Sequence, residues 1–154
     1  MKIQQKNLII CLAIPLAVGS LSALLTQNNM VTFQSINKPI LAPPGWLFPV
    51  VWTILYILMG IASYLVLMSE KPNDAALTVY GIQLLFNFFW SIIFFYLELY
   101  FFAFIWLVLL WLLILKTTKL FYQLSPPAGY LMLPYLLWVT FAGYLNFSIF
   151  LLNI

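Results

Sequence analysis

Five long apolar runs constrain what this chain can fold into. They cover about residues 8–25, 44–68, 75–97, 100–115 and 128–152. A helix needs roughly 20 apolar residues to cross the hydrocarbon core of a bilayer, which is roughly 30 Å thick. Only 6% of the residues are charged, whereas a soluble domain carries roughly a quarter. The sequence therefore predicts an all-α integral membrane protein, in which residues 1–154 form a single domain with a bundle of five transmembrane helices.

The first run, residues 8–25, has an alternative interpretation as a secretory signal peptide. Lys2 and Lys6 precede it as a basic segment would, and small residues lie between Ala13 and Ala23. However, the run has the full length of a membrane span, and no cleavage-like site precedes a polar mature domain. We therefore expect a membrane helix here, followed by the longest loop of the chain, residues 26–43.

The lysines are distributed unevenly over the two ends of the predicted bundle. The N-terminus and the second and fourth loops carry Lys2, Lys6, Lys71, Lys116 and Lys119, and the opposite end carries only Lys38. Loops that remain in the cytoplasm are enriched in basic residues. We therefore expect a multi-pass protein of the cell (plasma) membrane, in contact with its lipid, with a cytoplasmic N-terminus and with the first loop and the C-terminus outside.

A proline-rich segment leads into the second run. Proline fixes φ and restricts the preceding residue to extended geometry, so the segment from Pro39 to Pro44 is expected to be stiff, with Pro43 and Pro44 at the last loop position and the first helical turn. One face of the helix that follows collects aromatic, small and polar side chains: Pro49, Thr53, Tyr56, Gly60 and Ser63, with Trp52 at its edge. We expect this face to point into the bundle, for helix packing or for a pocket.

The chain offers few groups for catalysis or metal binding. It has no histidine and a single cysteine, Cys11, and its carboxylates Glu70, Asp74 and Glu98 fall at the predicted membrane surfaces. The bundle interior therefore lacks a general acid/base pair, a catalytic triad, and a ligand set for zinc or haem iron. We predict no catalytic residue, no metal site and no resident cofactor. The lysines are scattered, so we also predict no nucleic-acid partner.

Aromatic residues make up 19% of the chain, and several share helix faces with amides. Gln83, Asn87 and Trp90 fall on one face of the third helix, and the amides should point inward because exposing them to lipid is costly. The fifth helix has a stripe at every fourth residue: Trp138, Ala142 and Asn146. Bonding and packing between helices would explain these residues, and so would a flat apolar ligand that stacks on rings and is oriented by amides.

Three motifs in these runs resemble one known family. They are Lys38-Pro39-x-x-x-Pro43-Pro44-x-Trp46 continuing to Trp52, Tyr56 and Gly60, then Gln83-x-x-x-Asn87-x-x-Trp90, and then Pro134-Tyr135-Leu136-x-Trp138 continuing to Ala142 and Asn146. Together they resemble the translocator protein / tryptophan-rich sensory protein family (TspO/MBR, peripheral benzodiazepine receptor-like), in its bacterial form. The resemblance extends over nearly the whole chain.

The resemblance implies a five-helix bundle, commonly a homodimer, with a ligand pocket beneath the first loop. It makes Trp52, Asn87, Trp90, Trp138 and Ala142 pocket residues and makes Pro43, Pro44 and Trp46 part of the covering loop. Tyr56, Gln83 and Asn146 join this predicted ligand-binding set because they share helix faces with its members.

The function implied by the resemblance is a receptor, sensor or carrier for tetrapyrroles such as protoporphyrin IX or haem. The alternatives are an enzyme that degrades porphyrin with light and oxygen, a porphyrin transporter, and a structural membrane subunit. The first loop has Thr32, Phe33 and Leu41 where family members often carry tryptophan or tyrosine. Fewer loop tryptophans and the lack of acid/base groups favour binding over degradation.

Overall fold

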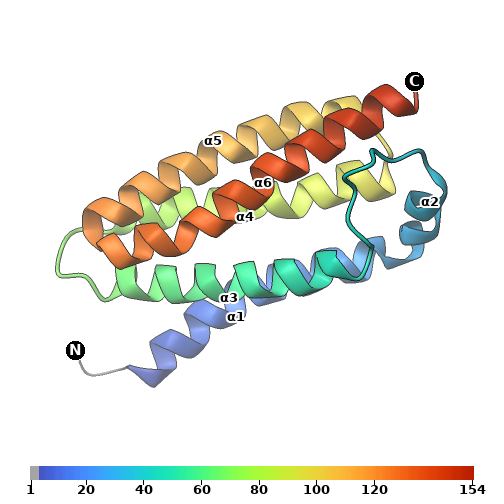
Figure 1. Cartoon of the computed structure of the whole chain (residues 1–154). Helices are drawn as coiled ribbons and strands as arrows, with labels where there is room; N and C mark the ends of the chain where they lie inside the picture. Colours follow the sequence, from blue (N-terminus) through green and yellow to red (C-terminus); the bar gives the residue numbers. More distant parts are fainter. Residues whose placement is uncertain (1–3) are drawn as a thin grey trace.

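Figure 1 shows the computed structural model of this chain, which describes residues 4–154, as an elongated bundle of long helices. Lys2, which entered the orientation argument, lies outside the described residues. In chain order the elements are α1 (Gln5–Thr26), the short 3₁₀ turn η1 (Gln27–Asn29), α2 (Met30–Ser35), α3 (Leu47–Leu67), α4 (Asp74–Ser91), the π-helical turn η2 (Ile92–Tyr96), α5 (Tyr100–Leu124) and α6 (Pro126–Leu152).

The predicted fold class is confirmed. Within residues 4–154, five helical segments are long and apolar enough to cross a membrane, and they correspond to the five apolar runs. α5 packs along α6, α1 along α3, and α4 along α5. α1 begins at one end of the bundle, and the C-terminus lies at the other, beside the connection that contains α2 (Figure 1).

The connection between α1 and α3 differs from the loop expected over residues 26–43. Its first part is helical, through η1 and α2, and the extended loop covers only residues 36–46. The placement of Pro44 in the first helical turn was wrong, because α3 begins at Leu47. The Leu47 amide donates to the Pro44 carbonyl at 3.0 Å, which closes a turn before the helix starts.

The connection between α5 and α6 is shorter than the segment between the predicted runs of residues 100–115 and 128–152. α5 continues through Lys116 and Lys119 to Leu124, and α6 starts at Pro126. The polar residues do not end the helix because Thr117 donates its hydroxyl to the carbonyl of Leu113, one turn back, and Thr118 bonds Ile114 in the same way. Proline in the first turn of α6 is favourable, since its missing N–H would have no partner there.

α5 buries one face and exposes the rest of its surface. Leu107, Leu110 and Phe121 are buried in the core cluster, and the Trp106 indole N–H donates to the Phe86 carbonyl of α4 at 2.8 Å. One face of α5 therefore holds α4 and α6 together.

Candidate functional site: an aromatic cavity beneath the first loop

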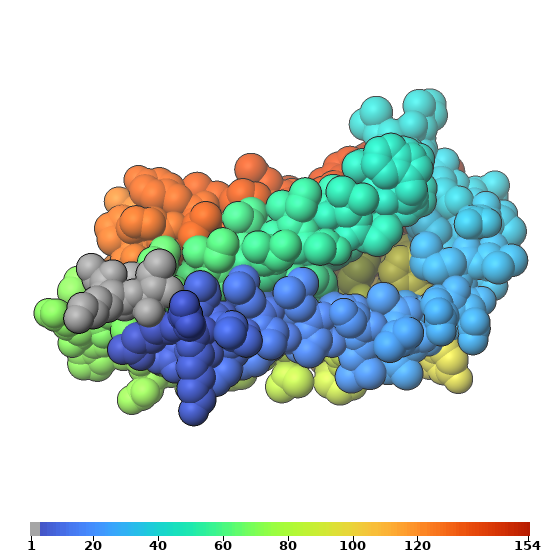
Figure 2. Space-filling view, turned by 90° about the horizontal axis from the view of Figure 1, so that it is seen from below, coloured from blue at the N-terminus to red at the C-terminus, as the bar shows by residue number. Residues whose placement is uncertain are grey.

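A cavity of about 420 Å³ lies beneath the loop of residues 36–46. Its walls come from α1, the start of α3, the end of α4 with η2, and the second half of α6. Figure 2 shows a hollow at this place, between α1 and the start of α3. The lining is mostly apolar: Leu16, Gly19, Ser20, Ser22, Ala23, Thr26, Gln27, Met30, Phe33, Ala42, Pro43, Gly45, Phe48, Pro49, Trp52, Thr53, Tyr56, Trp90, Ser91, Phe94, Phe95, Trp138, Ala142, Leu145, Asn146 and Ile149.

Aromatic rings hold one another in place around this cavity. Trp52 stacks on Tyr56, one turn along α3, with ring centroids 5.6 Å apart and planes 27° apart. Trp90 stacks in the same way on Phe94, at 5.3 Å and 27°. Offset stacking is a favourable arrangement of aromatic pairs. The cavity therefore presents flat apolar surfaces whose orientation is fixed before any ligand arrives.

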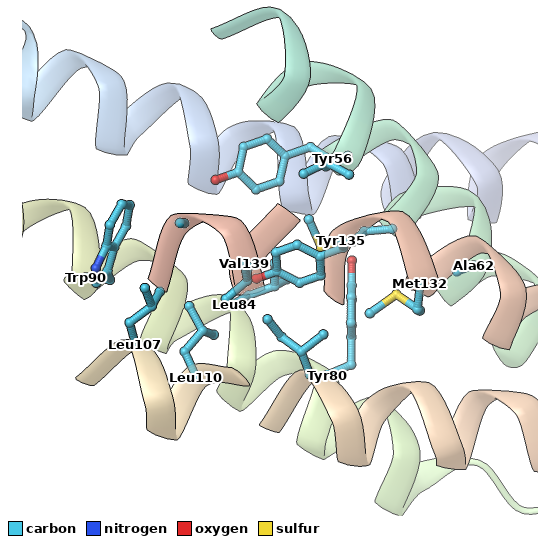
Figure 3. Packing of buried hydrophobic residues seen from close by; sticks show 14 of the residues in the cluster. Tyr56, Ala62, Tyr80, Leu84, Trp90, Leu107, Leu110, Met132, Tyr135 and Val139 are labelled. Carbon is cyan, nitrogen blue, oxygen red and sulfur yellow. The ribbon is translucent and has the colours of Figure 1, made fainter. Parts of the chain in front are cut away.

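A chain of hydrogen bonds lies directly below these rings. Tyr56 donates its hydroxyl to Asn87 Oδ1, Asn87 Nδ2 donates to the Tyr135 hydroxyl, and Tyr135 donates to Gln83 Oε1, each at 2.8 Å. Figure 3 shows the Tyr56 side chain from α3 and the Tyr135 side chain from α6 extending in the same direction, with both hydroxyls at the same end. Buried amides and phenols need such partners. These hydrogen bonds connect α3, α4 and α6 beneath the cavity.

Asn146 makes a second polar link at the cavity wall. The Trp90 indole N–H donates to Asn146 Oδ1 at 3.1 Å, and Asn146 Nδ2 donates to the Tyr100 carbonyl at 2.8 Å. Asn146 thus fixes the Trp90 ring and connects α6 to the first residue of α5.

Trp138 differs from the polar residues above in its hydrogen bonding. Its indole Nε1 is buried and has no hydrogen-bond partner among residues 4–154. Its ring contacts Phe48 edge-on, with centroids 6.0 Å apart. A buried donor without a partner costs free energy, so a group of a bound molecule that accepts this hydrogen bond would be stabilised.

The structure brings most of the predicted site residues together. Those that line the cavity are Pro43, Trp52, Tyr56, Trp90, Trp138, Ala142 and Asn146. Gln83 and Asn87 are outside the described lining and form the hydrogen-bonded layer below it. Pro44 and Trp46 also fall outside that lining, and Trp46 is 66% exposed, because the turn before α3 directs this part of the loop outward.

Sequence reasoning missed several residues of the site. Tyr135 completes the polar layer, Phe33 and Phe48 form the wall under the loop, and Gly19 brings α1 to the cavity. Tyr135 could have been found, because it lies three residues before Trp138 and seven before Ala142, on the same helix face. Phe33 and Gly19 could not, because only the three-dimensional packing of α1 and α2 brings them here.

Within residues 4–154, no group of three or more His, Cys, Asp or Glu side chains is placed to hold a metal ion. The cavity lining contains no charged residue among those described. The described lining therefore offers aromatic surfaces and a few hydrogen-bonding groups, without charge.

Comparison with known proteins gives a consistent result over most of the chain. The profile of the TspO/MBR family matches residues 11–152. The chain is 40% identical to the tryptophan-rich protein TspO of Chlorobaculum tepidum, over 96% of both proteins. It is 40% identical to the tryptophan-rich sensory protein of Cereibacter sphaeroides, over 79% of this chain and 76% of that protein.

The similarity extends to animal proteins. The chain is 34% identical to the translocator protein of Bos taurus, over 75% of this chain and 70% of that protein. The family match, the relatives and the five apolar helices agree with one another. The chain is a multi-pass membrane protein that belongs to the TspO/MBR family.

Proposed function

We propose that this protein is a membrane receptor or carrier that binds flat apolar ligands, in particular tetrapyrroles such as protoporphyrin IX or haem, in the cavity beneath the first loop. The observation that carries the proposal is the Trp138 indole N–H, which is buried without a described partner beside pre-arranged aromatic walls. A ring system would stack on these walls, and an acceptor at its edge would satisfy this donor once the Trp138 ring turns its Nε1 toward the cavity.

The names of the relatives support the two roles in this proposal. One relative is called a sensory protein and another a translocator protein. Binding in the cavity is the step that both roles share. We also propose the orientation inferred from the lysines, with the N-terminus in the cytoplasm and the loop of residues 36–46 outside. The homodimer implied by the resemblance stays a prediction.

Replacing Trp138 with alanine is expected to weaken protoporphyrin IX binding about tenfold, since loss of a stacked ring and one hydrogen bond together amounts to roughly 1.4 kcal/mol. Binding is measured by tryptophan quenching during titration of detergent-solubilised protein in the dark. Trp111→Ala is the matched control, because Trp111 bonds Thr140 on α6 and is outside the described cavity lining. Equal affinity of the Trp138→Ala and Trp111→Ala proteins would count against the cavity as the binding site.

The same titration under light separates binding from degradation. A saturable signal with an unchanged porphyrin spectrum supports a receptor or carrier. A new absorbing species that forms more than once per protein molecule would instead indicate an enzyme.

The proposed orientation can be tested in intact cells with a membrane-impermeant thiol reagent. Cysteine is placed at Lys38 in the loop or at Lys71 between α3 and α4, both outside the long helices. Lys38→Cys is expected to be labelled and Lys71→Cys to be labelled only after lysis. The reverse pattern would place the N-terminus outside.

A further inference from the structure

The rim of the cavity is exposed on one side only. The lining residues that are also exposed lie on the facing sides of two segments: Ser20, Ala23 and Gln27 at the end of α1 and in η1, and Gly45, Pro49 and Thr53 around the start of α3. Lining residues on α4, η2 and α6 are buried or half-buried. The hollow between α1 and α3 in Figure 2 is this rim, and we call it the side mouth.

Two glycines explain where the side mouth begins. A Cβ on Gly60 would lie 2.8 Å from Leu12 Cα, and a Cβ on Gly19 would overlap the Tyr56 ring. α1 and α3 are therefore in close contact up to Gly19. Beyond it α1 continues toward Thr26, alongside the first turns of α3, and small residues such as Ser20 and Ala23 leave the space between the helices open.

The side mouth lies at membrane depth. Ser20 and Ala23 are inside the first candidate span and Thr53 is inside the second. Thr53 is roughly 9 Å along the helix axis from the start of α3, at about 1.5 Å per residue. Lipid chains therefore surround the part of the side mouth formed by Ser20, Ala23 and Thr53. Gly45 belongs to the loop and lies outside the candidate spans.

The end of the cavity that faces water is closed by the loop, which is fastened to the end of α6. The backbone N–H of Asn37 donates to Asn153 Oδ1 at 3.1 Å, and Asn153 Nδ2 donates to the backbone carbonyl of Asn37 at 2.9 Å. Asn37 Nδ2 also donates to the Leu152 carbonyl at 3.3 Å. We call these bonds the asparagine latch.

Aromatic packing seals the space under the latch. Phe33 lies against Phe95 with ring centroids 5.3 Å apart, and against Phe94 at 6.0 Å. The Lys38 ammonium covers the Phe33 ring at 4.8 Å from its centroid, a favourable cation–π contact. A molecule coming from water would have to displace both the latch and this cluster.

We propose that apolar ligands enter and leave the cavity sideways from the bilayer, through the side mouth between α1 and α3, while the asparagine latch keeps the aqueous end closed. The identity of the ligand rests on the proposed function, but the route does not. A flat apolar molecule partitions into the bilayer, so the side mouth opens toward the phase in which the ligand is concentrated.

The test uses a thiol inside the cavity of the full chain, reconstituted in phosphatidylcholine vesicles. Ala142→Cys places the thiol on the buried cavity wall. Two maleimides of similar size report its accessibility, an apolar one that dissolves in lipid and a sulfonated one that remains in water. The parent protein supplies the blank, because its Cys11 is buried. Each labelling rate is divided by the rate of the same reagent with a free thiol in solution. On this scale we expect the apolar reagent to label the introduced thiol faster than the charged reagent does.

Ala23→Trp narrows the side mouth and is expected to slow labelling by the apolar reagent by about tenfold or more, the effect of roughly 1.4 kcal/mol of added barrier. Ala17→Trp is the matched control, because Ala17 is exposed on the same helix and is outside the described cavity lining. Thr53→Trp puts the obstacle on α3, so a variant that fails to fold does not end the test. Unchanged labelling in a folded Ala23→Trp or Thr53→Trp protein would overturn the route.

Asn153→Ala tests the latch. It removes two of the three latch bonds, those with the Asn37 backbone N–H and carbonyl. Because one hydrogen bond worth about 1 kcal/mol already corresponds to about fivefold, labelling by the charged reagent should become about fivefold faster or more, and the apolar reagent's rate should stay unchanged. Asn28→Ala, at an exposed asparagine of the same end, should change neither rate. If Asn153→Ala speeds labelling by the apolar reagent, or leaves the rate of the charged reagent unchanged, the proposal that the latch closes the aqueous end of the cavity is overturned. These labelling experiments use no porphyrin. A failed porphyrin titration would therefore count against the proposed ligand but not against the proposed route.

Discussion

Replacing Gly60 with alanine is expected to lower the free energy of unfolding by about 1–3 kcal/mol, the usual cost of overpacking a closely packed interior. The added Cβ would lie 2.8 Å from Leu12 Cα and 2.9 Å from the Cys11 carbonyl oxygen. Both atoms belong to the α1 backbone, which cannot turn aside as a flexible side chain can. The helices α1 and α3 would therefore have to move apart along the contact that ends at the side mouth.

Gly81→Ala is the matched control for this prediction. Nothing lies within 4 Å of a Cβ at Gly81 among the described residues, and the position is inside α4. Alanine should therefore stabilise the helix there by about 0.5–1 kcal/mol, the difference in helix propensity. Denaturant titration in detergent, followed by circular dichroism, compares the two variants. Equal stability of both would show that the α1–α3 contact tolerates separation.

Gly60 also shows what the sequence could predict. The spacing of apolar and small residues placed Gly60 on the inward face of its helix, because that face is set by the 100° step between residues. The membrane-spanning runs were predictable for a similar reason, since a bilayer requires a certain apolar length. Whether Gly60 packs a helix or borders the pocket was not predictable. The structure shows contact with α1.

The parts that could not be predicted depend on contacts between distant residues or on local hydrogen bonds. Asn37 and Asn153 are 116 positions apart, and no periodicity pairs them. α5 continues past Lys116 because the hydroxyls of Thr117 and Thr118 donate to carbonyls of the same helix. From the sequence, this group of lysines and threonines predicted the end of the helix. For the same reason the sequence did not reveal that Asn87 bonds the hydroxyls of Tyr56 and Tyr135; its contact with a ligand stays a prediction.

Replacing Asn87 with alanine is expected to lower the free energy of unfolding by about 2–3 kcal/mol. Asn87 is 1% exposed, and both ends of its amide are bonded, to the Tyr56 hydroxyl and to the Tyr135 hydroxyl at 2.8 Å each. A buried polar group that loses its partner costs about 1–3 kcal/mol, and a hydrogen bond between membrane helices contributes up to roughly 1.7 kcal/mol. Tyr56 loses its acceptor, whereas Tyr135 still donates to Gln83.

A double-mutant cycle with Tyr135→Phe measures whether these groups act as one network. Each single variant breaks the bond between Asn87 and Tyr135, so the double variant should lose less stability than the two single losses added, by about 0.5–3 kcal/mol. Asn28→Ala, at an exposed asparagine, should stay within about 0.5 kcal/mol of the parent protein. Strictly additive losses would mean that Asn87 and Tyr135 contribute independently.

Asn87→Ala also distinguishes a residue that supports the cavity wall from a residue that contacts the ligand. Asn87 lies outside the described lining and acts on the cavity through the Tyr56 ring, whereas Trp138 is part of the wall. Asn87→Ala should therefore reduce porphyrin affinity less than Trp138→Ala does, and act mainly on stability. Stability comes from denaturant titration and affinity from tryptophan quenching on the same preparations. If Asn87→Ala instead had the larger effect on affinity at nearly unchanged stability, the ligand would have to reach below the tyrosines and bond the amide directly.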